Sequence, residues 1–136
     1  MAVQLSVSVR NARLDAIETT IGTSAIVRIR SGAPPATCAT ADSGTVLAEF
    51  TLASDWAGAA SAGSKSFSNT PLTDASANNT GTAGHYRVYD SAGTTCHMQG
   101  TITATGGGGD MTLDNTSITS GQQVQITSWS LTDGNA

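Results

Sequence analysis

The sequence predicts a mainly β protein, an antiparallel β-sandwich or jelly-roll-like domain with one N-terminal α-helix. Three observations lead to this fold class. Several short runs alternate apolar and polar residues, turn signals rich in Gly, Pro, Asn and Asp separate those runs, and one segment before residue 22 has helical periodicity instead. The chain has 136 residues, the length of one ordinary domain. We therefore expect a single domain over residues 1–136, with a helical arm over 1–23 and a β domain over 24–136.

The composition favours a folded chain with a hydroxyl-rich surface. Charged residues make up 12% of the sequence, about half the usual share, and Thr, Ser, Ala and Gly are abundant. A disordered Ser/Thr/Gly chain is the alternative, but a hydrophobic content of 38% and the alternating runs favour a β domain. The net charge of -4 and the scattered basic residues argue against a nucleic-acid partner.

The sequence shows no pattern typical of a membrane protein or a secreted one. No apolar run approaches the roughly 20 residues that a membrane-spanning helix needs. The first residues lack the basic region and apolar core of a cleaved secretion signal. We therefore expect no membrane partner and synthesis in a cytoplasm.

The N-terminal segment predicts a helix over about residues 8–21. Val7, Leu14, Ile17 and Ile21 fall on one helical stripe, and Gly22 is a natural helix stop. This helix either closes one end of the β domain or packs against a neighbouring subunit, and the two alternatives are weighted evenly. The polar face of the helix is supplied by Arg10, Arg13, Asp15 and Glu18.

The β domain begins with two alternating runs, residues 25–30 and 45–52. They form a plausible antiparallel pair, joined by a loop that carries Cys38, with Arg28 and Arg30 on one face. The second run turns Val46, Ala48, Phe50 and Leu52 toward the core.

Residues 53–82 form an irregular insertion, with Trp56, Phe67 and Leu72 as its large apolar residues. A stretch of this length is either an ordered, contact-making surface or a disordered insertion with Trp56 placed in the core.

Regular patterning then resumes to the end of the chain. Residues 84–89 and 96–105 predict a hairpin around a turn at 90–93, and four glycines at 106–109 follow as a flexible connection. A short strand at 111–113 precedes a last strand at 124–131, whose buried face shifts near Ser128, as a β-bulge would explain.

Residues that could carry chemistry are few, so we predict no catalytic residue, no cofactor and no metal. His85 and His97 lack the spacing of a ligand set, and Cys96 and His97 are adjacent in a strand, so their side chains point to opposite faces. Cys38 and Cys96 could pair, but structural thiols are the favoured interpretation. A calcium site is a minor alternative to ordinary turn chemistry for Asp110, Asp114 and Asn115.

Five phrases of the sequence carry a resemblance that extends over nearly the whole chain. They are VRNARLDAIETTIGTS at 9–24, TAGHYRVYD at 82–90, GTTCHMQG at 93–100, GGDMTLDNTSI at 108–118 and VQITSWSLTDGNA at 124–136. With these phrases the chain resembles a family of small structural proteins of tailed-bacteriophage particles. The resemblance implies a non-enzymatic virion component and transfers no functional residue.

The expected role is therefore a capsid decoration protein that binds the outer head shell and stabilises it. The partner would be the major capsid protein, with tail or neck proteins as the alternative, and we expect a homo-oligomer. Such a protein needs a compact β body and an arm that lies along neighbouring subunits. The candidate interface residues are Leu14, Ile17, Ile21, Trp56 and Phe67.

Two other classes of function stay open. A carbohydrate-binding or adhesin-type β-sandwich would use exposed aromatic side chains, for which Trp56, Tyr89 and Trp129 are the candidates. A hydrolase would need His85 or His97.

Overall fold

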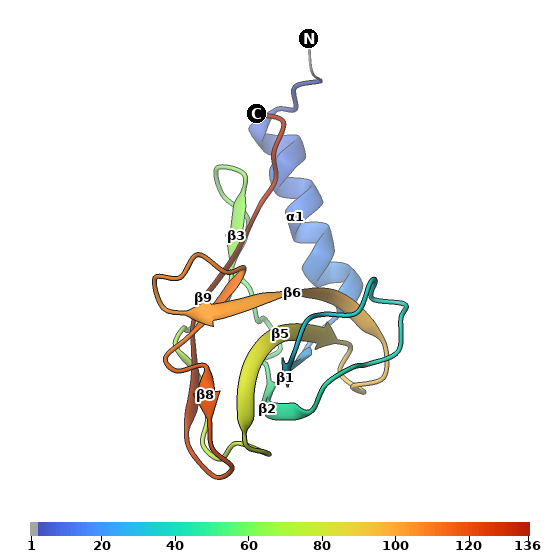
Figure 1. Ribbon diagram of the computed structural model, residues 1–136. Helices are drawn as coiled ribbons and strands as arrows, with labels where there is room; N and C mark the ends of the chain where they lie inside the picture. The colour runs from blue at the N-terminus through green and yellow to red at the C-terminus, as the bar shows by residue number, and fades with distance from the viewer. Residues whose placement is uncertain (1–2) are drawn as a thin grey trace.

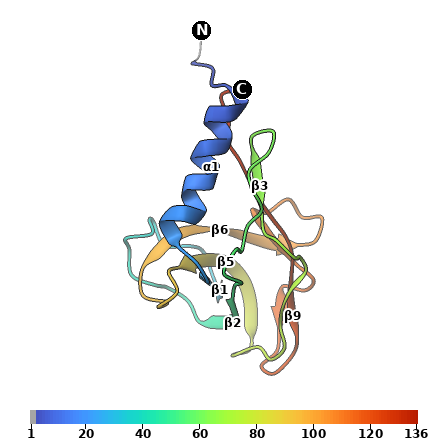
Figure 2. The same ribbon diagram turned by 180° about the vertical axis from the view of Figure 1, so that it is seen from behind.

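The computed structural model describes residues 3–136, which form a helix standing on one end of a curled β body (Figures 1 and 2). Helix α1 (Val7–Ile21) projects from the body, with β3 and the C-terminal segment beside it. The mainly β prediction with one N-terminal helix is confirmed. The strands are β1 (Ile26–Ser31), β2 (Val46–Thr51), β3 (Ser64–Ser66), β4 (Leu72–Asp74), β5 (Gly81–Tyr89), β6 (Cys96–Ala104), β7 (Met111–Leu113), β8 (Ser117–Ile118) and β9 (Val124–Thr132).

The nine strands hydrogen-bond into one curled, mixed sheet with the order β2-β1-β5-β6-β7-β9-β3. In addition, β4 pairs with β9, and β8 pairs with β5. The β6–β7 pair is parallel and the other pairs are antiparallel. Alternation of apolar and polar residues reports which face is buried, but it does not encode the direction of a neighbouring strand.

The glycine run makes the parallel pair possible. Six residues, 105–110, carry the chain from the end of β6 back to Met111, which pairs with Ile102. Gly106 and Gly108 have φ of 84° and 81°, and a Cβ on Gly109 would lie 2.9 Å from the backbone nitrogen of Thr103. The glycines are therefore an ordered, close-packed reversal.

The strands expected from alternation are present with the expected pairing. β1 and β2 are antiparallel, and β5 and β6 form the hairpin. The shift of face in the last strand is a bulge, because Thr112 pairs with Ser128 while Leu113 pairs with Ile126, which leaves Thr127 extra. The bulge allows Ile126 and Trp129 to be buried on the same side.

The core lies between the inner face of the sheet, the end of α1 and the segment after β2. Trp56, Phe67 and Trp129 form an aromatic group, in which the ring centroids of Phe67 and Trp129 are 4.5 Å apart. The Trp129 Nε1–H donates to the Tyr86 hydroxyl at 2.9 Å, which satisfies the buried indole. Residues 53–82 are therefore ordered, packed against their own chain, and include β3 and β4.

Helix α1 begins and ends with regular caps. The Ser6 side chain accepts a hydrogen bond from the Val9 backbone N–H at 3.3 Å. At the other end Gly22, with φ of 92°, donates its N–H to the Glu18 carbonyl. No helix in residues 3–136 is long and apolar enough to cross a membrane.

The polar face of α1 contacts the rest of the chain. Glu18 Oε1 accepts hydrogen bonds from the backbone N–H groups of Trp56 and Ala57, each at 3.1 Å. Asp15 Oδ1 accepts from the Ala60 N–H at 2.8 Å, and Arg10, which is buried, donates to the Asp133 carbonyl at 3.1 Å. Both the apolar and the polar stripes of this helix are therefore used to fix it on the body.

Candidate functional site

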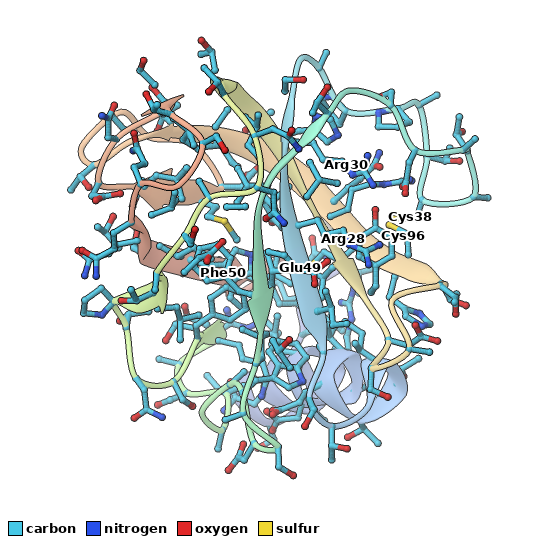
Figure 3. All side chains as sticks on the ribbon, turned by 90° about the horizontal axis from the view of Figure 1, so that it is seen from below. Arg28, Arg30, Cys38, Glu49, Phe50 and Cys96 are labelled. Carbon is cyan, nitrogen blue, oxygen red and sulfur yellow. The ribbon has the colours of Figure 1, made fainter. Side chains whose placement is uncertain are left out.

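A loop formed by residues 32–44 covers the outer face of the sheet beside β1, β5 and β6. Figure 3 shows Arg28, Arg30 and Glu49 on the side of β1 and β2 that faces this loop, and Phe50 on the opposite side. Most side chains on this face are polar, as alternation predicts, but four of them are buried under the loop. They are Arg30, His85, Arg87 and Tyr89.

Arg87 is the centre of this arrangement and is 1% exposed. Its Nη2 donates to the carbonyl oxygens of Thr37, Cys38 and Thr40, each at 3.0 Å, and its Nη1 donates to Asp42. Its Nε donates to Gln99 Oε1 at 3.1 Å. A guanidinium suits this position because its donors diverge in one plane and can satisfy several fixed acceptors together.

Asp42 places one carboxylate between two arginines. Arg30 Nη2 lies 2.7 Å from Oδ2, and the Tyr89 hydroxyl donates to Oδ1 at 2.7 Å, on the same oxygen that Arg87 contacts. Burial by itself would raise the pKa of Asp42, but the hydrogen bonds from Tyr89 and Arg87 and the charge of Arg30 outweigh it and lower that pKa. Asp42 is therefore ionised at neutral pH and balances charge that the sheet would otherwise carry uncompensated.

His85 contributes a neutral contact at the start of the loop. Its side chain is fully buried, and its Nδ1 lies 2.8 Å from the Gly32 carbonyl oxygen, so Nδ1 carries the proton. The other ring nitrogen, Nε2, is buried and has no hydrogen-bond partner among residues 3–136. Burial lowers the pKa of His85, and the charges of Arg30 and Arg87 act in the same direction against the Gly32 hydrogen bond.

The two thiols lie at the edge of this cluster. Cys38 and Cys96 are free and half-buried, and with Asp42, Arg87 and Tyr89 they line a cavity of about 220 Å³. Burial and the neighbouring Cys38 thiol raise the pKa of Cys96 to about 11. Across residues 3–136, no group of three or more His, Cys, Asp and Glu side chains has an arrangement that could hold a metal ion.

No family model, curated protein or solved structure matches this chain. Two regions of the structure bear on function. They are the covered cluster just described and an apolar end. The cluster uses its charges to hold backbone carbonyls, which is a structural task. The apolar end carries the exposed valines.

The apolar end is the part of the molecule around the start of α1, where Val3, Val7 and Val9 are exposed. The three valines are 74%, 48% and 47% exposed and are the exposed large apolar residues among residues 3–136. Farther along the helix a groove of about 240 Å³ lies between α1 and the end of β9, and it is lined by apolar residues (Leu14, Ile17 and Leu131) and polar ones (Arg13, Thr132 and Asp133). The C-terminal segment completes this end, since the Leu5 backbone N–H donates to the Asn135 carbonyl at 2.6 Å.

The structure divides the five residues predicted as an interface. Leu14 and Ile17 line the groove between α1 and the end of β9, although Leu14 is only 3% exposed. Ile21, Trp56 and Phe67 belong to the core and contact their own chain. The exposed apolar side chains of the helix therefore lie near its beginning, while those farther along pack against the chain's own core.

The residues named for other functions are also placed. Trp56, Tyr89 and Trp129, the candidate sugar-binding aromatics, are each 2% exposed, so they offer no stacking surface in this conformation. His85 is buried, while His97 is exposed and Cys96 half-buried. The β5–β6 register shifts here, because Val88 pairs with Met98 and Tyr89 pairs with Cys96.

Asp110, Asp114 and Asn115 bond the backbone of their own turns. Asp110 Oδ2 accepts from the Thr101 N–H at 2.9 Å, and Asp114 Oδ1 accepts from the Gln125 N–H at 3.0 Å. Asn115 Oδ1 accepts from the Ser117 N–H at 2.9 Å. These contacts are the turn chemistry that the sequence favoured over a calcium site.

Sequence reasoning missed the covered cluster and the exposed valines. One signal for the cluster was present: Gly84 lies inside a strand, where glycine often marks a close backbone approach. A Cβ at Gly84 would lie 2.1 Å from the Gly32 carbonyl oxygen, so the loop can only begin where it does because this side chain is absent.

Proposed function

We propose that this protein is a non-enzymatic structural component of a tailed-phage particle, a decoration protein that attaches to the outer head shell through its apolar end. The observation that carries the proposal is that Val3, Val7 and Val9, which lie at or just before the first turn of α1, are all exposed. Apolar side chains exposed near one another can mark contact sites. The choice of a phage particle rests on the resemblance of the sequence phrases to small phage structural proteins.

The rest of the molecule suits an outward-facing body. The β body has a surface rich in Ser and Thr and exposes little positive charge, because three of its four basic residues, Arg30, Lys65 and Arg87, are buried. Attachment would then rest on apolar contact and backbone hydrogen bonds, with little contribution from ion pairs. The major capsid protein is the expected partner, the virion is the expected location, and a homo-oligomer on the shell is the expected assembly.

Sedimentation with particles tests this proposal. The purified protein is mixed separately with undecorated head shells and with isolated tails of its source particle, and the pellets are imaged by electron microscopy. Regular density on the shell supports the decoration role and reports its symmetry. Binding only to tails or necks would indicate a tail or neck component instead of a decoration protein. Binding to neither shells nor tails would contradict a virion role.

A matched pair of variants locates the contact. Val7→Asp combined with Val9→Glu removes the exposed apolar atoms while favouring the helix, because acidic residues stabilise its first turn and Glu at this position can complete a capping box with Ser6. The control is Ser120→Asp, an exposed turn residue at the opposite end. We expect the first variant to lose at least about tenfold in affinity, equivalent to about 1.4 kcal/mol, and the control to bind normally.

A further inference from the structure

Cys38 and Cys96 come together from distant parts of the chain, and the surrounding contacts determine where each one lies. Cys96 pairs with Tyr89 across the β5–β6 hairpin, and residues directly opposite in an antiparallel pair point to the same face. That face is the one covered by the loop of residues 32–44. Cys38 lies in this loop, and Figure 3 shows it next to Cys96.

Buried hydrogen bonds hold the loop of residues 32–44 in this position on the sheet. Arg87 holds the Cys38 carbonyl oxygen itself and the carbonyl oxygens of Thr37 and Thr40 on either side of it. Gln99 Nε2 donates to the Pro35 carbonyl at 2.6 Å. The two thiols are therefore brought together by β5, β6 and the loop that these strands hold, and they line one cavity at the surface.

We propose that Cys38 and Cys96 are a disulfide site, which closes under a disulfide oxidant and latches the loop of residues 32–44 onto the sheet. The bond would join residues 58 positions apart in the sequence, which is 96 minus 38. A cross-link over such a separation restricts the unfolded chain strongly. This inference does not depend on the proposed virion role.

The chemistry balances with glutathione disulfide as the oxidant. The Cys38 thiolate attacks one glutathione sulfur, which forms a mixed disulfide and releases the first glutathione thiolate. Cys96 then loses its proton and attacks the Cys38 sulfur, which forms the protein disulfide and releases the second glutathione thiolate. Two protein thiols are oxidised and one glutathione disulfide is reduced to two thiols. Because Cys96 holds its proton tightly, we expect the second step to be slow at neutral pH and faster in alkali.

The test uses the full chain, reduced first and then incubated with glutathione disulfide at pH 8. We expect an intact mass lower by two hydrogens, no thiol left for alkylation, and a monomer on a non-reducing gel. Cys38→Ser and Cys96→Ser are the matched controls, and each should stop at a one-glutathione adduct. Three outcomes would each overturn the proposal. They are glutathione adducts on both cysteines of the wild-type protein, covalent dimers, and two free thiols in the folded wild-type protein at a time when an unfolded sample has fully reacted.

A second measurement tests the latch itself. We expect backbone amide exchange in residues 32–44 to slow in the oxidised protein, and the midpoint of thermal unfolding to rise by on the order of 10 °C over the reduced protein. Neither change should follow the same treatment of Cys38→Ser. A disulfide that forms without slowing exchange in the loop would refute the latch.

Discussion

At the scale of single residues, the basic side chains of this protein serve mainly as anchors for backbone. Arg10, Arg30, Lys65 and Arg87 are buried, four of the six basic residues in the chain. Three of them donate to backbone carbonyls as well as to carboxylates, so each one fixes a segment that has no regular secondary structure. Most of the positive charges of this chain are therefore buried, where the loss of a partner would lower the free energy of unfolding.

Replacing Asp42 by Asn should therefore destabilise the protein. The change keeps the shape of the side chain but leaves Arg30 and Arg87 without a counter-charge under the loop. We expect a loss of about 2 kcal/mol in the free energy of unfolding, measured with urea. Asp55→Asn, at an exposed position, is the control and should change stability by less than about 0.5 kcal/mol. Equal stability of the two variants would show that the carboxylate is dispensable.

His85 should make stability depend on pH in the mildly acidic range. Its folded pKa is lower than the ordinary value of 6.5, so below that pH the unfolded chain binds a proton that the folded protein resists. The free energy of unfolding should therefore fall as the pH decreases from about 7 toward 5, by at most about 1.4 kcal/mol per pH unit from this group. His85→Gln, which can still donate to the Gly32 carbonyl, should show a flatter profile. Parallel profiles for both proteins would rule out this role.

At the scale of elements, Lys65 clamps helix α1 to the irregular segment. Its Nζ contacts Asp15 Oδ1 at 2.9 Å, Glu18 Oε2 at 3.1 Å and the Gly58 carbonyl at 2.8 Å, which uses all three donors. Burial would lower the pKa of Lys65, but the hydrogen bonds and charges of the two acids outweigh burial and raise it. The ammonium group therefore stays charged while it is 3% exposed.

Lys65→Met should loosen the helix. We expect a loss of about 2–3 kcal/mol in the free energy of unfolding, because two carboxylates lose their buried partner, together with faster amide exchange along α1. The comparison is Arg13→Met, which removes an ion pair with Asp133 from a side chain that is 55% exposed and should cost less than about 0.5 kcal/mol. Similar losses in both variants would mean that the clamp adds nothing beyond a surface ion pair.

The elements that alternation could reveal were predicted well, and the missing ones depend on contacts that alternation does not report. The helix, the β1–β2 pair, the β5–β6 hairpin and the bulge at Thr127 follow from residue periodicity. The docking of residues 32–44 could not be predicted, because Arg87 looks the same in a sequence whether water or carbonyl oxygens surround it. The exposure of the valines could not be predicted either, because it depends on which part of the helix packs against the body. That is a property of the tertiary structure.

At the scale of the whole molecule, the apolar end and the polar body predict how attachment responds to salt. If apolar contact dominates, affinity for the shell should change by less than about threefold when the salt concentration is raised several-fold, because few charges are present to be screened. Sedimentation with shells at a series of salt concentrations measures this. Release at moderate salt would mean that ion pairs hold the protein and that the apolar end is secondary.

The hydrogen bond between Leu5 and Asn135 has a further consequence for the connectivity of the chain. Since these two residues touch, a short peptide linker from Asn135 to Val3 could join the chain at this end and keep all three valines, and the chain could be opened instead within the exposed glycines at 106–108. Such a circular permutant would test whether the parallel β6–β7 pair needs an unbroken reversal at residues 105–110. It would also move both new chain ends away from the valines, so that a fluorescent label or an affinity tag could be attached without crowding those side chains.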